Sequence, residues 1–122
     1  MLIIWLMLLH WLGDFVLQTD WMAVHKASDR KALFTHIGVY GATMFTGLFS
    51  MFGFSAIWFV LLNAILHGII DYVTSKASHY CNDTGDRHNM FVMIGLDQFV
   101  HFVFLYLTMG MLTVPVIEKI FL

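Results

Sequence analysis

Charged residues are scarce in this chain: Asp, Glu, Lys and Arg make up 11% of the 122 residues, whereas 60% are hydrophobic. A soluble domain of this composition would have too little polar surface to cover itself. The net charge of −2 gives no electrostatic support for nucleic-acid binding. Cysteine occurs once, as Cys81, which excludes an internal disulfide. The composition therefore predicts a polytopic membrane protein that is covered by lipid.

Long apolar runs predict four membrane-spanning helices in an up-down bundle, so the chain is expected to be an all-α protein with one domain, residues 1–122. Roughly 20 apolar residues cross a bilayer as a helix. The spans are expected at about residues 2–19, 32–52, 56–73 and 90–114. The first run lacks the basic start and the small-residue cleavage site of a signal peptide, so we expect a retained span.

Polar and turn-forming segments separate these spans. Residues 20–31 are polar and basic and are expected to form a loop or an interfacial helix. Residues 53–55 (Gly-Phe-Ser) are expected to form a short turn, and residues 75–89, the most polar segment, a loop. Pro115 is expected to end the last span.

Each predicted span carries ionisable side chains, and in three of the spans they are spaced four residues apart. In the third span Asn63, His67 and Asp71 recur in this way, which places them on one helix face. Because His and Asp are costly against lipid, this face is expected to point into the protein. The seven candidates are His10, Asp14, His36, His67, Asp71, Asp97 and His101.

The order of the spans is expected to bring these side chains to the same side of the membrane. They come late in the first and third spans and early in the second and fourth, and His10 and His101 lie deepest. The basic residues of the connecting segments fall on this side too. The positive-inside rule then predicts that both polar loops face the cytoplasm and both termini lie outside.

Four imidazoles and three carboxylates in one bundle predict a metal site. No Lys or Arg lies within the predicted spans, and a buried carboxylate needs a counter-charge. A divalent cation would supply it. His and Asp ligands suit Zn²⁺, Mn²⁺, Fe²⁺ or Ni²⁺, of which we expect Zn²⁺. All seven candidates are expected to bind or orient the ion, whereas Gln18, Asn63 and Gln98 are expected to be structural or to orient ligands.

The predicted function is a metal-dependent hydrolase acting on a lipid or lipid-linked substrate at the cytoplasmic leaflet. A bound metal activates water and polarises a carbonyl or phosphoryl oxygen. A carboxylate that is not a ligand can act as general base, and Asp14 and Asp97 are the catalytic candidates.

Two alternatives stay open. A metal-ion or proton transporter or channel would use the same residues, although the outer halves of the spans carry few polar groups. In a non-catalytic phage or bacterial membrane partner protein, the cluster would only specify the fold through hydrogen bonds between helices.

Two other patterns are weighed separately. Gly38, Gly41 and Gly47 give the second span a small-residue side that permits a homodimer. A further group of metal-binding residue types lies in the predicted loop, where a solvated loop is expected rather than a second metal site. Its members are His79, Cys81, Asp83 and His88.

The polar residues recur in short motifs. These are His10-x-x-x-Asp14-Phe15-x-x-Gln18-Thr19-Asp20, then Lys26, His36, His67-x-x-x-Asp71 and Asp97-Gln98-x-x-His101. In these motifs the chain resembles a family of small bacterial and phage membrane proteins known as a domain of unknown function. The resemblance implies a four-helix membrane protein of a bacterium or its phage, and it implies no established activity. We expect the protein in the bacterial inner membrane. A looser chemical likeness connects the chain to membrane-embedded metal-dependent hydrolases such as the ceramidase superfamily, whose fold has more helices.

Overall fold

The computed structural model describes residues 1–113, which form an all-helical chain. The elements are α1 (Leu2–Trp11), the π-helical turn η1 (Leu12–Val16), α2 (Asp20–His25), α3 (Arg30–Phe52), the 3₁₀ turn η2 (Gly53–Ser55), α4 (Ala56–Asp83) and α5 (Arg87–Thr108). The expectation of an all-α fold is confirmed. Pro115 and the expected end of the last span at residue 114 lie outside the described residues.

The first predicted span, residues 2–19, is shorter and less regular than expected. The helix widens into the π-helical turn η1 and ends at Val16. Asp14 sits in this widened turn and is 2% exposed, and His10 in α1 is 0% exposed, so both face the interior. Gln18 lies beyond the helix, because the backbone has already left it.

Side-chain caps begin the next two helices. The Thr19 hydroxyl accepts a hydrogen bond from the backbone N–H of Met22 and begins α2. The Asp29 carboxylate accepts a hydrogen bond of 2.9 Å from the backbone N–H of Lys31 and begins α3. Of the two alternatives for residues 20–31, the short helix is therefore the one observed.

The predicted loop at residues 75–89 is wrong, because α4 continues to Asp83 and α5 begins at Arg87. Residues 84–86 connect the two helices, and Gly85 has a φ of 77°, a conformation that favours glycine. The polar stretch at the end of α4, residues 75–83, contains no glycine or proline. The polar composition ends the apolar run, but it does not end the helical hydrogen bonding.

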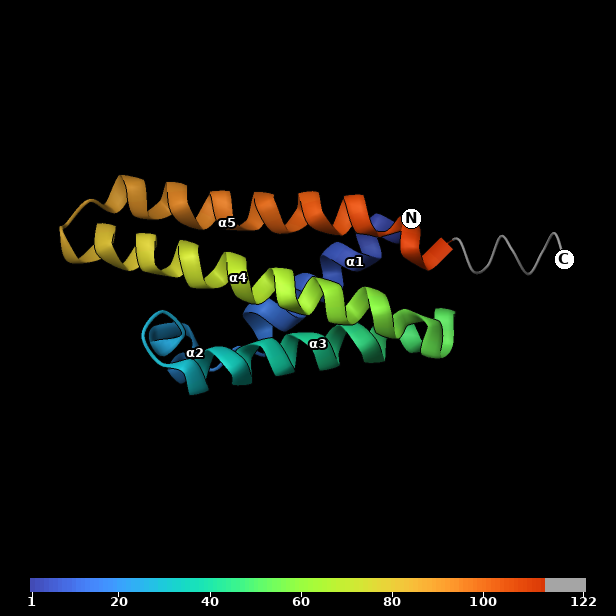
Figure 1. The fold of residues 1–122 in the computed structure, drawn as a ribbon. Coiled ribbons are helices and arrows are strands. Elements are labelled where there is room, and N and C mark those ends of the chain that lie inside the picture. The colour runs from blue at the N-terminus through green and yellow to red at the C-terminus, as the bar shows by residue number, and fades with distance from the viewer. Residues whose placement is uncertain (114–122) are drawn as a thin grey trace, which may run out of the picture.

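The three long helices are folded back on one another, with α4 between α3 and α5 (Figure 1). The predicted turn at residues 53–55 is confirmed, since η2 reverses the chain there and Gly53 has a φ of 57°. The shorter α1 contacts both α3 and α5, and α2 contacts the beginning of α3. Side chains of α1, η1, α3, α4 and α5 therefore share one interior.

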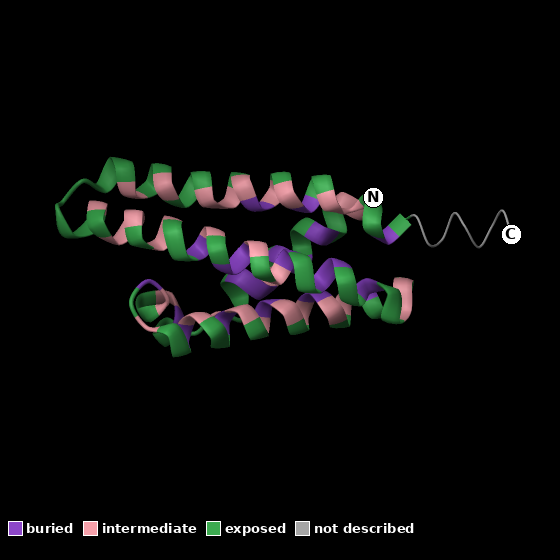
Figure 2. Cartoon of the chain, viewed as in Figure 1, coloured by how far each residue is buried: buried purple, intermediate pink, exposed green. Residues whose placement is uncertain are grey.

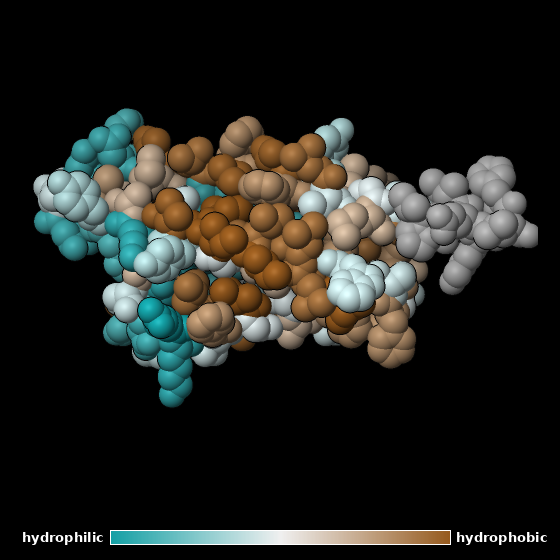
Figure 3. All heavy atoms as spheres, viewed as in Figure 1, coloured by the Kyte–Doolittle hydropathy of each residue, from teal (hydrophilic) through white to brown (hydrophobic). Residues whose placement is uncertain are grey.

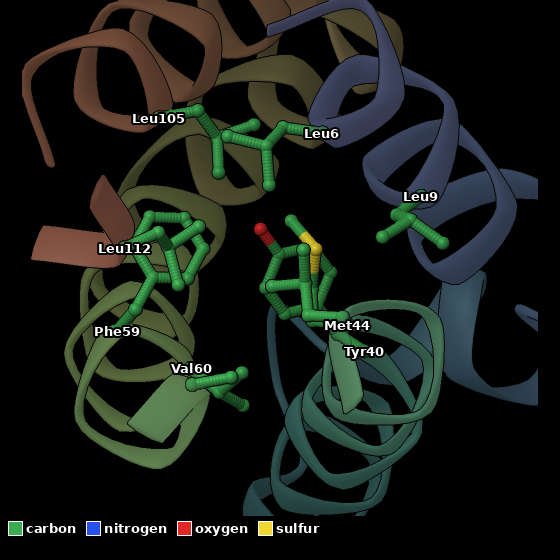
Figure 4. Close-up of a cluster of buried hydrophobic side chains, with 10 residues drawn as sticks. Leu6, Leu9, Tyr40, Met44, Phe59, Val60, Leu105 and Leu112 are labelled. Carbon is green, nitrogen blue, oxygen red and sulfur yellow. The ribbon is translucent and has the colours of Figure 1, made fainter. Parts of the chain in front are cut away.

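An apolar core fills the half of this interior nearer the N-terminus. Leu6, Met44, Phe59 and Leu105 are each at most 1% exposed, and Figure 4 shows their side chains with Tyr40 between the helices. In α1 and α4 the core residues precede the His and Asp residues in sequence, and in α3 and α5 they follow them. Because neighbouring helices run antiparallel, all of these core residues lie at the end of the bundle that holds the N-terminus. The apolar core therefore fills the bundle between the polar residues and the end that holds the N-terminus.

The outer surface is also apolar. The outward faces of the helices are exposed (Figure 2). Hydrophobic residues cover the middle of the molecule, whereas hydrophilic residues gather at the end that holds α2 and the α4–α5 turn (Figure 3). Phe34, Trp58 and Leu107 are between 67% and 70% exposed. By length and composition, two stretches can cross a membrane, Arg30–Asp83 and Arg87–Thr113, and Leu2–Val16 is a shorter apolar helix.

Replacement of Gly13 in η1 tests the close approach of this turn to α3. A Cβ atom at Gly13 would lie 3.2 Å from the Cα of Tyr40 and 3.4 Å from the Cβ of Thr43. Because the nearest atom is backbone, we expect Gly13→Ala to push η1 outward and to cost about 1–3 kcal/mol of unfolding free energy. Thermal unfolding followed by circular dichroism measures this, with Gly38→Ala as control, since its Cβ meets nothing within 4 Å. Equal stability of both variants would contradict the close packing.

Candidate metal centre

The structure brings together all seven ionisable residues that the sequence singled out. Their side chains come from α1, η1, α3, α4 and α5, and they form three groups whose ligand atoms lie within 4.8 Å of one another. The groups are His10, His67 and His101; Asp14, His36, His67 and Asp71; and Asp14, Asp97 and His101. All except Asp97 are between 0% and 3% exposed. These buried groups can hold a metal ion.

Five of the six distances between the four donor atoms of the inner group are close to those in a tetrahedral ligand shell. The Nε2 atom of His36 lies 3.0 Å from Nε2 of His67, 3.1 Å from Oδ1 of Asp14 and 2.9 Å from Oδ2 of Asp71. His67 Nε2 lies 3.6 Å and 3.5 Å from the same two carboxylate oxygens. Ligands about 2.0–2.1 Å from a Zn²⁺ ion stand about 3.3–3.4 Å apart at the corners of a tetrahedron.

Both inner imidazoles direct the same ring atom toward the carboxylates. The Nδ1 atoms of His36 and His67 are buried without a hydrogen-bond partner among residues 1–113. The polar contacts of both rings therefore run through Nε2. Tyr40 fixes the plane of His67, because the two rings stack in parallel with centroids 3.8 Å apart.

The remaining candidates surround this inner group. His101 Nε2 lies 3.1 Å from Oδ1 of Asp71 and 3.5 Å from Oδ1 of Asp97, so the imidazole links an inner carboxylate to an outer one. His10 Nε2 lies 3.5 Å from Oδ2 of Asp14, on the oxygen that faces away from the inner group. Asp97 is the outermost member, with its side chain 14% exposed.

Lys26 corrects the expectation that no basic side chain pairs the carboxylates. It lies outside the predicted spans, at the end of α2, but its Nζ reaches inward to 2.7 Å from Oδ2 of Asp71 and 3.7 Å from Oδ1 of Asp14. Burial acts to lower the pKa of Lys26, but the charges of Asp71 and Asp14 outweigh it and raise that pKa above its ordinary value. Lys26 is therefore a charged member of the site at neutral pH.

Two polar side chains hold the carboxylates of Asp14 and Asp97 in place. Gln98 donates through Nε2 to Asp14 Oδ2 at 2.9 Å and to Asp97 Oδ2 at 2.8 Å, while its Oε1 lies 3.1 Å from His10 Nε2. Thr74 donates its hydroxyl hydrogen to Asp97 Oδ1. Gln98 is expected to be structural or to orient ligands, and its hydrogen bonds to Asp14 and Asp97 place it where it can orient these carboxylates.

Asn63 and Gln18 do not join this network. Asn63 bonds to the Phe59 carbonyl and to Thr108, on the core side of the cluster, which agrees with its expected structural role. Gln18 lines a cavity, and its Oε1 atom has no partner among residues 1–113.

Three site residues were missed at the sequence level: Lys26 as an ion-pair partner, Tyr40 and Thr74. Two of them carried a readable signal. Tyr40 follows His36 by four residues, and Thr74 lies three residues after Asp71, so helical spacing places each beside a candidate. Lys26 had no such signal, because the connection between α2 and α3 folds it back over the bundle.

A cavity of about 240 Å³ gives access to the cluster from the hydrophilic end. Asp14, Lys26 and Asp97 line its inner part, Ser78 and His79 lie toward the α4–α5 turn, and Phe15, Met93 and Ile94 make an apolar wall. The cavity lies between η1, α2, α4 and α5, which all contribute lining residues. A partly apolar molecule can therefore reach Asp97 from this side.

The other patterns noted in the sequence contribute little to this site. Among residues 1–113, none of His79, Cys81, Asp83 and His88 belongs to a group that can hold a metal. On α3, Gly47 faces Leu9 and Gly41 faces Ala64 within the same chain, while Gly38 faces open space. The homodimer stays a prediction.

These features define an all-helical protein with two stretches apolar enough to cross a membrane and a buried His/Asp cluster able to hold a metal ion. The chain belongs to the family described as "Protein of unknown function (DUF3307)", whose model matches residues 2–121. No curated protein and no solved structure matches the chain.

Proposed function

We propose that this protein is a membrane-embedded, metal-dependent hydrolase that cleaves a lipid or lipid-linked substrate at the cytoplasmic leaflet of a bacterial inner membrane. The four-atom group of His36, His67, Asp14 and Asp71 is the proposed ligand set, and Zn²⁺ is the proposed ion.

The observation that carries the proposal is the charge and spacing of this ligand set. Three carboxylates, those of Asp14, Asp71 and Asp97, face one ammonium group, that of Lys26, which leaves a formal charge of −2 when the histidines are neutral. One divalent cation balances that charge. Four donor atoms at tetrahedral spacing would hold the cation with two imidazoles and two carboxylates.

The membrane placement rests on the surface and on the loop charges. In the proposed topology α3, α4 and α5 each span the bilayer, and α1 with η1 forms a shorter fourth span. The basic residues of the described chain gather at the hydrophilic end, which the positive-inside rule assigns to the cytoplasm. They are Lys26, Arg30, Lys31, Lys76 and Arg87.

The residues of the chain divide the proposed chemistry between them. A bound divalent ion lowers the pKa of a coordinated water and polarises the bond to be cleaved. Asp97, at the cavity and held by Thr74 and Gln98, is positioned to accept the proton of the attacking water. Asp14 suits a ligand better than a base, because its Oδ1 belongs to the inner group, whereas Asp97 lies outside that group.

A transport function has less support from the arrangement. A permeating ion needs polar groups along its whole path. Below His10 the interior is filled by Leu6, Met44, Phe59 and Leu105, whose side chains offer an ion no oxygen or nitrogen ligand. Hydrolysis needs access from one side only, which is what the cavity beside Asp97 offers.

Elemental analysis of the purified protein tests the metal centre. We expect at least one equivalent of a divalent transition metal per chain, and we expect His67→Ala to lose it. The affinity should fall by more than the roughly 10–100-fold typical for residues that only orient a ligand. His88→Ala is the matched control, since His88 is exposed and belongs to no metal group within residues 1–113.

The possible results are separable. Folded wild-type protein without metal, even after incubation with Zn²⁺, would refute the metal centre. Metal uptake into proteoliposomes without hydrolysis of any bacterial lipid would favour transport instead. Equal metal contents of His67→Ala and His88→Ala would exclude His67 from the ligand set.

A further inference from the structure

A second cavity, of about 330 Å³, lies between the α2–α3 connection and α4, on another face of Lys26. We name it the basic cavity and define it by Lys26, Arg30, Leu33, Tyr72 and Lys76, which all line it. Lys26 lines the cavity beside Asp97 as well, so the two cavities have this residue in common.

The basic cavity carries positive charge that residues 1–113 leave uncompensated. Lys26 pairs with Asp71, whereas Arg30 and Lys76 form no ion pair with any carboxylate of the described chain. Asp29 also lines the wall and accepts the backbone N–H of Lys31; its carboxylate offsets one of these two charges, so the wall keeps a net charge of +1 besides the Lys26–Asp71 pair. A guanidinium and an ammonium therefore face the same hollow and are available to an anion.

Tyr72 adds a neutral donor between these charges. Lys76 Nζ donates a hydrogen bond to the Tyr72 hydroxyl and lies 3.9 Å from the centroid of the ring. The hydroxyl hydrogen of Tyr72 remains a donor, and the residue is 46% exposed. Arginine, lysine and a hydroxyl together match the oxygens of a phosphate group, since arginine binds two of them at once.

The basic cavity lies at the border of the apolar surface. Its wall contains Leu33 and Tyr72, and the neighbouring residues Phe34 and Val73 are 69% and 59% exposed. One turn before Tyr72, Ile69 is 58% exposed and continues this surface. An anion held in the cavity therefore has room beside it for hydrocarbon chains along α3 and α4 (Figure 3).

We infer that the basic cavity binds the phosphate group of an anionic phospholipid, with Arg30 and Lys76 as the charge partners and the Tyr72 hydroxyl as a hydrogen-bond donor. The inference rests on the membrane placement in the proposed function. It requires neither metal nor hydrolysis. A lipid held here has its headgroup next to Lys26, which also lines the cavity at Asp97.

Binding of short-chain lipids to the full-length protein in a neutral detergent tests the inference. The probes are dioctanoyl phosphatidic acid, dioctanoyl phosphatidylcholine and inorganic phosphate, with affinities measured by microscale thermophoresis. We expect phosphatidic acid to bind most tightly. The double variant Arg30→Gln/Lys76→Gln should bind it at least about tenfold more weakly, and added salt should weaken wild-type binding because the contacts are ionic.

Two controls separate a site from a general charge effect. Lys31→Gln/Arg87→Gln removes two cations from the same end of the molecule that do not line the cavity, so its affinity should stay within about twofold of wild type. Tyr72→Phe removes only the hydroxyl and should weaken binding several-fold. If Arg30→Gln/Lys76→Gln does not fold, Tyr72→Phe decides, and its unchanged affinity would overturn the inference.

Three other outcomes would each contradict the proposed lipid site. Equal weakening by both double variants would mean attraction without a site, and inorganic phosphate binding as tightly as phosphatidic acid would exclude a lipid-specific site. Phosphatidylcholine binding as tightly as phosphatidic acid would exclude selection for anionic lipid. Metal content, measured on the same samples, should not change with Arg30→Gln/Lys76→Gln, so failure of the metal centre and failure of this inference are distinguishable.

Discussion

Asp97→Asn is expected to lower the rate of lipid hydrolysis by about 10²–10⁴-fold, the usual contribution of a general base, while the metal stays bound. The amide retains the size of the side chain, and its one oxygen can still accept the hydrogen bond from Thr74, but its NH2 group cannot accept from Gln98 and the amide cannot accept a proton from water. The four atoms of the inner group do not include Asp97. Substrate binding and folding should therefore change much less than the turnover rate.

The measurement uses radiolabelled bacterial lipids and follows the release of a water-soluble headgroup or a fatty acid. Asp83→Asn is the matched control, because Asp83 is an exposed carboxylate at the end of α4, outside the metal groups of the described chain. Full activity of Asp97→Asn would rule out the proposed base. Loss of metal and activity together would instead make Asp97 a ligand.

Asp71→Ala is expected to be the most destabilising single change in the cluster, by about 3–5 kcal/mol of unfolding free energy. Asp71 is 0% exposed, and its carboxylate contacts Lys26 at 2.7 Å, His36 at 2.9 Å and His101 at 3.1 Å. Alanine would leave the Lys26 ammonium buried without this partner. It would also remove one ligand of the proposed ion.

Thermal unfolding in detergent, followed by circular dichroism, measures the loss, and Asp83→Ala supplies the exposed control. Replacing both partners, in Lys26→Met/Asp71→Leu, should recover part of the stability, because no buried charge is then left alone. A loss below about 1 kcal/mol for Asp71→Ala would place the pair among weak, solvent-screened ion pairs and contradict its buried role.

The candidate site could be read from the sequence to a large extent, for a specific physical reason. Ionisable side chains are so costly in an apolar helix that their presence marks an interior position. Spacing of four residues then puts His67 and Asp71 on one face, and the same logic holds for His10 with Asp14 and Asp97 with His101. All of these converge, as does the isolated His36.

The boundaries of the helices were harder to predict, because hydropathy and helicity are different properties. The polar stretch that ends α4 was expected to be a loop, although its residues continue the helix to Asp83. The first span was expected to reach residue 19, but it ends at Val16 in a π-helical turn. Such a turn depends on how closely Gly13 approaches Tyr40, a contact between residues distant in the chain.

Local pattern in the chain thus specified the helical class, the short turn at residues 53–55 and the seven polar residues that meet inside, since each depends on side-chain chemistry repeated at helical spacing. Long-range folding alone placed the Lys26 ammonium next to Asp71 and Asp14, stacked Tyr40 on His67 and formed the two cavities that Lys26 lines. Those contacts join residues separated by up to 45 positions, and no periodicity encodes such a pairing.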